Sequence, residues 1–178
     1  MFHDGRSKRV IFLAHCLLNQ NAISDGTAVC PAAFKNALQL LLDAGTGIIQ
    51  MPCPELCCLG LDRGDSCGTD RPAVVENTGI RQAMQEPPAS ERLAVLAGQV
   101  LRQITEYHRH GFEILGIVGA NRSPTCGVET TSDHGEEIEG RGLFIEAIAY
   151  RLAQESLSVP MVGVKRPEDA AGKIKALL

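Results

Sequence analysis

Three of the seven cysteines, Cys16, Cys53 and Cys126, each follow a short apolar run within a few residues. Cys53 lies between two prolines, which fix the backbone, and Cys126 precedes a glycine in a turn-forming stretch. The thiolate form of cysteine binds metals and acts as a nucleophile, so three such side chains that meet predict a metal or catalytic site. A buried free cysteine can also pack as a small apolar side chain, which is the favoured interpretation for one cysteine alone. Three cysteines at the ends of strands favour a metal or catalytic site over simple packing.

The spacing of the cysteines bears on which metal they would hold. Structural zinc sites favour Cys-x-x-Cys pairs and four ligands. This chain has instead the vicinal pair Cys57-Cys58 and the single spacing Cys53-x-x-x-Cys57. Three thiolates without an evident fourth favour an iron–sulfur cubane with one open iron, which acts on substrate as a Lewis acid. A zinc or redox dithiol site built from Cys53, Cys57 and Cys58 stays open as the alternative.

The composition limits the partners and the compartment. The chain has 178 residues, a net charge of −4 and a pI of about 5.7, so it carries no electrostatic footprint for nucleic acid. A small polar substrate fits this balance better. An odd number of cysteines without a secretory signal argues against a disulfide framework, and no apolar run reaches membrane-span length. We therefore expect a cytoplasmic protein without a membrane partner, and a homodimer is left open.

The apolar patterning predicts a single α/β domain over residues 1–178, Rossmann-like, with a parallel sheet flanked by helices. Buried strands are expected at residues 10–14, 47–51, 114–118 and 160–164. Helices are expected from Pro31 to Gly45, from Ser90 to Gly111, over 143–152 and over 167–175. Residues 53–89 show no sustained period and are predicted to form a long functional loop, and residues 129–140 a polar loop. Since ligands bind beyond the carboxyl ends of parallel strands, the three cysteines are expected at one edge of the sheet.

Three short motifs together are similar to the signature of a known family. They are Ala14–Asn19, Pro52–Glu55 and Arg122–Gly127. In order and spacing they resemble the 2-thiouracil desulfidase family, and more closely a related desulfidase-like branch. The family pattern runs Ser-Ala-Cys-Leu-Leu-Gly, then Cys-Pro-Glu before Gly-Gly-Leu, then Ser-Pro-Ser-Cys-Gly. The resemblance extends over most of the chain, and the three motifs are specific only in combination.

The resemblance implies a [4Fe–4S] cluster held by Cys16, Cys53 and Cys126. Its fourth iron would take the sulfur of a thiolated small molecule, and water would replace that sulfur on carbon without net redox change. Glu55 and Ser123 would be the proton-handling pair. Taken from the residues alone, Glu55 fits a solvated loop carboxylate equally well, and Ser123 a turn-capping hydroxyl.

Four polar residues beside these motifs are predicted to bind substrate: His15, Asn19, Asn121 and Arg122. Asn19 stands where the family pattern has glycine, and residues 56–63 replace its Gly-Gly-Leu run. The expected substrate is a thiouracil-like thiocarbonyl compound, and the rival function is a cluster-based sulfur carrier or accessory protein. Cys57, Cys58 and Cys67 could supply a different ligand or bind a relayed sulfur, but pocket lining or core is the favoured interpretation for each. The Arg63-Gly64-Asp65 tripeptide is interpreted as chance.

Overall fold

The fold is seen in a computed structural model, which describes residues 4–23, 30, 34–65, 67 and 70–178. The strands are β1 (Arg9–Leu13), β2 (Gly47–Gln50), β3 (Glu113–Ala120), β4 (Thr130–Asp133), β5 (Glu136–Glu139) and β6 (Met161–Val164). The helices are α1 (His15–Leu18), α2 (Lys35–Asp43), α3 (Pro54–Leu59), α4 (Ala73–Gln85), α5 (Ala89–Arg109), α6 (Leu143–Gln154) and α7 (Pro167–Lys175). The helix start expected at Pro31 lies outside the described residues.

Four strands form one parallel sheet in the order β2-β1-β3-β6. Strand β1 lies inside this sheet, and its residues Ile11, Phe12 and Leu13 are fully buried. A strand covered on both faces needs a continuous apolar run rather than an alternating one, which explains the sequence of β1. The predicted α/β fold with a parallel sheet is confirmed.

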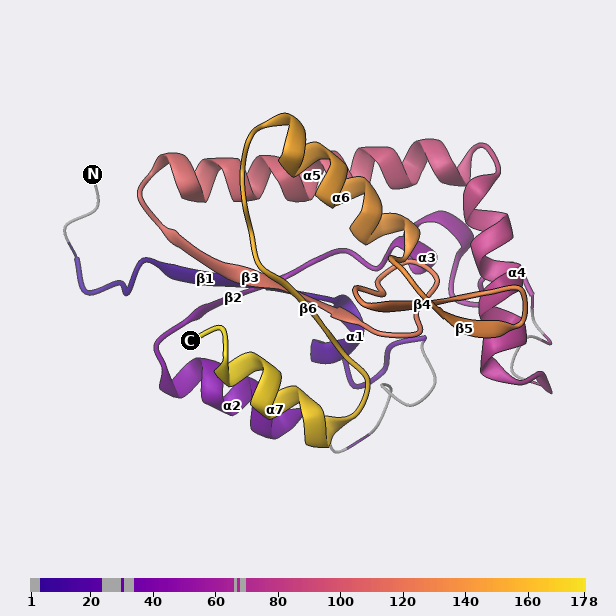
Figure 1. The fold of residues 1–178 in the computed structure, drawn as a ribbon, viewed down its shortest axis with the longest axis horizontal. Helices are drawn as coiled ribbons and strands as arrows, with labels where there is room; N and C mark the ends of the chain where they lie inside the picture. The colour runs from indigo at the N-terminus through magenta and orange to yellow at the C-terminus, as the bar shows by residue number, and fades with distance from the viewer. Residues whose placement is uncertain (1–3, 24–29, 31–33, 66, 68–69) are drawn as a thin grey trace.

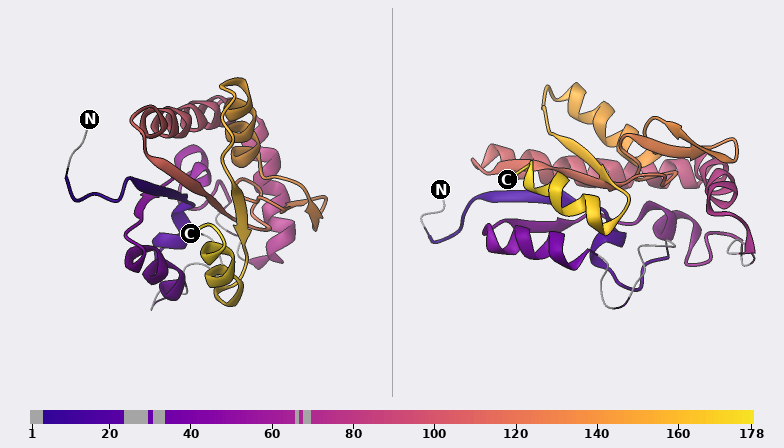
Figure 2. Two further views of the ribbon diagram at one scale, coloured as in Figure 1. Left: turned by 60° about the vertical axis from the view of Figure 1, so that its left-hand side comes forward. Right: turned by 60° about the horizontal axis from the view of Figure 1, so that its bottom comes forward.

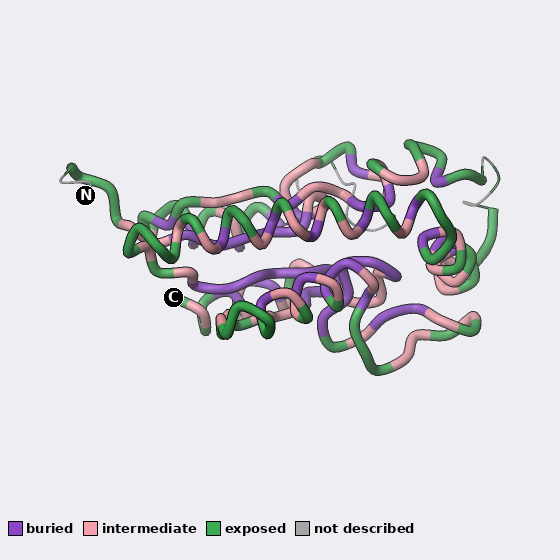
Figure 3. The backbone as a smooth tube through the Cα atoms, turned by 90° about the horizontal axis from the view of Figure 1, so that it is seen from above, coloured by how far each residue is buried: buried purple, intermediate pink, exposed green. Residues whose placement is uncertain are grey.

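Two pairs of helices cover the two faces of the sheet. Helices α5 and α6 pack together on one face, and α2 and α7 on the other (Figure 1). The long helix α5 turns Leu93, Ala97, Val100 and Ile104 inward at spacings of three and four residues, which is the stripe of an amphipathic helix. Viewed from above, the central strands β1 and β3 are mostly buried and the outer turns of the helices are exposed (Figure 3). Among the described residues, no helix is both long enough and apolar enough to span a bilayer.

The remaining elements gather at the carboxyl ends of the sheet strands. Helices α1, α3 and α4 and the β4–β5 hairpin lie at this end, where the hairpin packs beside α4 (Figure 2). Strands β2 and β3 flank β1 on opposite sides, so the chain order reverses between β1 and β3. This reversal is the topological switch point at which open α/β sheets bind ligands.

Two loop predictions were wrong. The predicted loop over residues 53–89 contains α3 and α4, and the polar loop over 129–140 forms the β4–β5 hairpin. Helix α4 buries Glu76, Ile80 and Met84 at four-residue spacing, so one position of its inner stripe is charged and the apolar period is broken. The hairpin turns at His134 and Gly135, whose positive φ angles of 52° and 77° match a two-residue primed turn.

A pair of glycine substitutions tests this packing. Gly98 lies within α5, and an added Cβ would meet nothing within 4 Å. Gly98→Ala is expected to raise the free energy of unfolding by about 0.5–1 kcal/mol, because alanine loses less backbone entropy on folding. Gly119→Ala would bring a Cβ to 2.2 Å from the carbonyl oxygen of Cys126 and is expected to lower it by about 1–3 kcal/mol. Urea denaturation measures both, and equal effects would contradict the packing described.

Candidate functional site

The three cysteines singled out by the sequence follow the three adjacent strands β1, β2 and β3. Cys16 lies in α1, Cys53 caps the amino end of α3, and Cys126 is buried in the loop after β3. The Sγ of Cys53 accepts the N–H of Leu56 at 3.5 Å. The structure therefore places all three at the carboxyl edge of the sheet, with Cys16 and Cys126 on the two sides of the switch point.

The thiols and Glu55 are close enough to affect one another electrostatically. Burial raises the pKa of Cys53 to about 12, and the charge of Glu55 and, less strongly, Cys16 act in the same direction. Burial also raises the pKa of Cys126 well above its ordinary value, with further contributions from Cys16, Cys53 and Glu55. Without a nearby cation, Cys53 and Cys126 are protonated thiols at neutral pH.

A single metal ion needs ligands that converge on one point, unlike an iron–sulfur cluster. In the described part of the chain, no group of three or more His, Cys, Asp or Glu side chains is arranged to hold a metal ion. The ligands of an iron–sulfur cluster bind different irons, so they surround a larger group and need not converge on one point.

The loop that carries Cys126 is shaped by Ser123. The Ser123 hydroxyl oxygen accepts the N–H of Cys126 at 2.9 Å and that of Thr125 at 3.3 Å. This is the turn-capping role considered from the sequence. The hydroxyl proton of Ser123 points toward Glu55 Oε1 at 3.4 Å or the Thr125 hydroxyl at 3.3 Å, both longer than an ordinary O–H···O bond.

The start of α6 holds the same loop from outside. The N–H groups of residues 142–144 donate to the carbonyl oxygens of Gly127, Pro124 and Thr125 at 3.0, 3.0 and 2.9 Å. A helix leaves its first N–H groups without internal partners, and here the loop carbonyls satisfy them. Gly142 permits this approach, since a Cβ there would lie 2.4 Å from the carbonyl carbon of Thr125.

Asn121 and Arg122, both predicted to bind substrate, are engaged with the loop and the hairpin. The Asn121 Oδ1 accepts three backbone N–H groups, from residues 128–130, and its Nδ2 donates to Glu129 Oε2 at 2.6 Å. The backbone of Arg122 has a positive φ of 71°, and its carbonyl accepts the hydroxyl of Ser132 at 2.7 Å. These contacts give both residues a structural role, and substrate binding by either stays a prediction.

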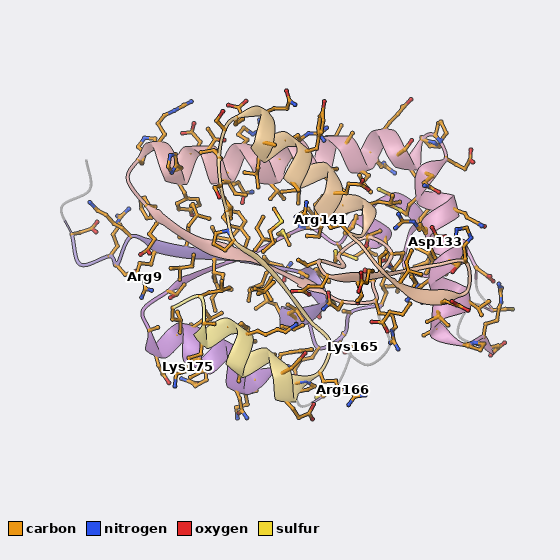
Figure 4. The ribbon with its side chains drawn as sticks, in the orientation of Figure 1. Arg9, Asp133, Arg141, Lys165, Arg166 and Lys175 are labelled. Atoms are coloured by element: carbon orange, nitrogen blue, oxygen red, sulfur yellow. The ribbon has the colours of Figure 1, made fainter. Side chains whose placement is uncertain are left out.

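Helix α4 adds a second support for the hairpin and the loop. Arg81 donates to the carbonyl of Pro124 and the hydroxyl of Thr131 at 3.4 and 3.3 Å. Arg81 Nε also lies 3.3 Å from Asp133, which is labelled beside α4 in Figure 4, far from Arg9 at the other end of the sheet. The segment predicted to be a long loop therefore contains a helix, α4, that helps to position the loop of Cys126.

His15 and Asn19, the other two predicted substrate-binding residues, contact each other across one turn of α1. The His15 Nε2 lies 2.9 Å from the Asn19 amide nitrogen, so Nε2 accepts and the ring proton is assigned to Nδ1. Burial lowers the pKa of His15, which favours this neutral imidazole. His15 lies on the same short helix as Cys16 and Asn19 caps that helix, and contact of either with substrate stays a prediction.

Glu55 is buried rather than solvated. Its side chain lies in the first turn of α3 and is 7% exposed. The Thr125 hydroxyl donates to Glu55 Oε1 at 2.7 Å, a shorter contact than the one from Ser123. Sequence analysis did not single out Thr125, although its place inside the third motif, directly before Cys126, was a usable signal.

The second oxygen of Glu55 faces an arginine that sequence analysis had set aside. Glu55 Oε2 lies 3.5 Å from Arg63 Nη1, and Arg63 Nη2 donates to Glu76 Oε1. The three side chains are at most 8% exposed. Neither Arg63 nor Glu76 was predicted, because neither belongs to a motif and both stand in the segment expected to be a loop.

The other cysteines lie in varied surroundings. Cys58 is half-buried and packs against the core, as the lining or core interpretation expects. Cys57, on the same helix, is exposed, and so are Cys30 and Cys67, so a place in the core is wrong for Cys57 and Cys67.

A curated protein is similar to this chain over most of its length, at low identity. A protein named uncharacterized protein MJ0003, from Methanocaldococcus jannaschii, is 27% identical over 150 residues. The similarity covers 82% of this chain and 87% of that protein, so the two share most of their length. No family model matches the chain, and no solved structure matches it.

A hydroxyl deletion tests the contact between Thr125 and Glu55. Thr125→Val keeps the shape but removes the donor to a buried carboxylate, and is expected to lower the free energy of unfolding by about 1–3 kcal/mol. Thr130→Val is the matched control, since Thr130 donates to the less buried Glu137 at 2.8 Å and water can replace it. Urea denaturation compares the two, and a loss at Thr125 no larger than at Thr130 would rule out a special contact.

Thiol reactivity provides a second test. In metal-free protein, iodoacetamide is expected to modify the exposed Cys30 and Cys57 well before Cys53 and Cys126. Burial shields the latter two, and their raised pKa values keep them protonated, whereas the thiolate is the reacting form. Peptide mapping by mass spectrometry at neutral pH follows each site. Early labelling of Cys126 would contradict the buried geometry.

Proposed function

We propose that this protein is a [4Fe–4S]-dependent desulfidase that exchanges the sulfur of a small thiocarbonyl compound for oxygen from water. The observation that carries the proposal is the set of three thiols from three separate segments at the switch point of the sheet, two of which, Cys53 and Cys126, interact with the buried Glu55 carboxylate. The motif resemblance supports the assignment of Cys16, Cys53 and Cys126 as ligands.

The donor set fits an iron–sulfur cluster. Thiolates are soft ligands that suit iron–sulfur centres. A bound cationic centre deprotonates coordinating thiols, which offsets the raised pKa values of Cys53 and Cys126. The neighbouring carboxylate, Glu55, contacts Thr125 and Arg63 instead of serving as a ligand, so it is available for proton transfer. Three sulfur ligands leave one coordination position for substrate.

The proposed reaction is balanced without an electron donor or acceptor. A thiocarbonyl and water give a carbonyl and hydrogen sulfide. When bound, the cluster supplies an open, soft iron that draws off the sulfur. Glu55 accepts a proton from the attacking water and returns it to the departing sulfide. Thr125, and Ser123 at longer range, hold Glu55 Oε1 in place for this transfer.

Metal analysis of anaerobically purified protein tests the cofactor. We expect about four irons and four acid-labile sulfides per chain, as in a [4Fe–4S] protein. Cys16→Ala, Cys53→Ala and Cys126→Ala are each expected to lose most of this iron. Cys30→Ala and Cys57→Ala, at exposed positions, serve as matched controls and should keep it. Zinc in place of iron, or a full cluster in Cys16→Ala, would overturn the assignment.

Turnover separates an enzyme from a sulfur carrier. The loaded protein is incubated with thiouracils and thioamides, and hydrogen sulfide and the carbonyl product are measured. Glu55→Gln is expected to keep its iron while kcat falls about 10²–10⁴-fold, the usual contribution of a general acid–base. A loaded protein that turns over no thiocarbonyl but passes sulfide to acceptors would favour the carrier function.

A further inference from the structure

The turn after α3 exposes an apolar side chain and buries a charged one. Leu61 is 70% exposed, whereas Arg63, two residues later, is 8% exposed. Arginine is almost never fully buried unless it is paired, and leucine is normally an inside residue. In this turn the guanidinium of Arg63 is therefore buried while the apolar side chain of Leu61 stays in solvent.

The backbone of this turn takes an uncommon conformation to do so. Gly60, Arg63 and Gly64 all have positive φ angles, of 89°, 54° and 78°. Glycine adopts this region freely, but for arginine it is unfavourable by about 1 kcal/mol. The positive φ at a non-glycine residue indicates that the inward direction of Arg63 is imposed by its contacts.

Those contacts join two buried carboxylates through one guanidinium. Arg63 Nη2 binds Glu76 in the first turn of α4, and Arg63 Nη1 faces Glu55 Oε2 at 3.5 Å. The opposite oxygen of Glu55 accepts the Thr125 hydroxyl at 2.7 Å, and that hydroxyl lies 3.7 Å from Cys126 Sγ. Glu55 is thus fixed from both sides, by a cation at one oxygen and a hydroxyl at the other.

Stability alone is a weak reason for this arrangement. A buried ion pair commonly gives no more stability than well-packed apolar residues of the same volume, because desolvation of the charges offsets their attraction. What it does provide is geometry, since the planar guanidinium presents its two terminal nitrogens in a fixed fork, one to each carboxylate.

We propose that Arg63, anchored by Glu76, is the positioning residue that fixes the Glu55 carboxylate for proton transfer at the three-thiol site. This inference rests on the proposed function for its kinetic consequence, but its structural claim concerns Glu55 alone. Arg63 is buried and acts through Glu55, which it faces at Oε2.

Arg63→Gly is the sharpest variant, because glycine suits the positive φ and only the side chain is lost. In the loaded enzyme, iron content is expected to be unchanged. The kcat for thiocarbonyl turnover should fall about 100-fold, which is typical of a displaced catalytic group, while KM changes less than about threefold. Guanidinium chloride at millimolar concentration should restore part of kcat. Arg71→Gly, which removes an exposed arginine paired with Asp65, should leave kcat unchanged.

Crystal structures of Arg63→Gly with and without guanidinium provide the readout that is independent of activity. The Glu55 carboxylate is expected to leave the Thr125 hydroxyl in the variant and to return when guanidinium binds. If Glu55 stays in place, or kcat is unaffected, or iron is lost together with activity, the positioning role is wrong.

Arg63→Lys covers the case in which Arg63→Gly does not fold. It keeps the positive charge without the two-pronged shape, so full iron content with a reduced kcat is expected, and wild-type kcat would refute the proposal. If the wild-type protein shows no desulfuration, the proposed function fails. The position of Glu55 in the crystal structures still decides the claim about Arg63.

Discussion

The architecture of the site depends on main-chain hydrogen bonds between the start of α6 and the loop that carries Cys126. These bonds satisfy N–H groups that no helix can satisfy internally. They hold the loop carbonyls in place through the main chain alone, without any side chain. Gly142 permits these bonds because it has no Cβ to meet Thr125, and Gly119 likewise lets the Cys126 carbonyl approach β3. With the loop fixed, the Thr125 hydroxyl faces Glu55 and the Cys126 thiol is held inside the protein.

The buried charge of Glu55 has two opposed effects on its surroundings. Burial is the main cause of the raised pKa values of Cys53 and Cys126, and the Glu55 carboxylate raises both further. It also needs a partner of its own, which Arg63 supplies from the turn after α3. The site therefore links electrostatics at the sheet edge to a turn and a helix that contain none of the thiols.

Sequence patterning predicted the sheet and the placement of the thiols, because buried parallel strands such as β3 require uninterrupted apolar runs and end at one edge. It missed α4, whose inner face combines Glu76 with Ile80 and Met84 and so lacks an apolar period. It also dismissed Arg63, since charged residues are normally solvated and only tertiary contacts reveal a buried pair. Local hydrophobic patterns determine helices and strands, whereas a network of buried charges depends on contacts between segments far apart in the chain.

The wide separation of the three cysteines along the chain has a consequence for biosynthesis. Cys16, Cys53 and Cys126 meet only through the parallel sheet, and the last of them is held by α6 and by Asn121, which donates to the carbonyl of Gly163 in β6. A nascent chain still lacking these elements on the ribosome has no enclosed set of three thiols. Any group that needs all three thiols therefore requires α6 and β6 to have folded around them, so its insertion follows folding of the sheet rather than guiding it.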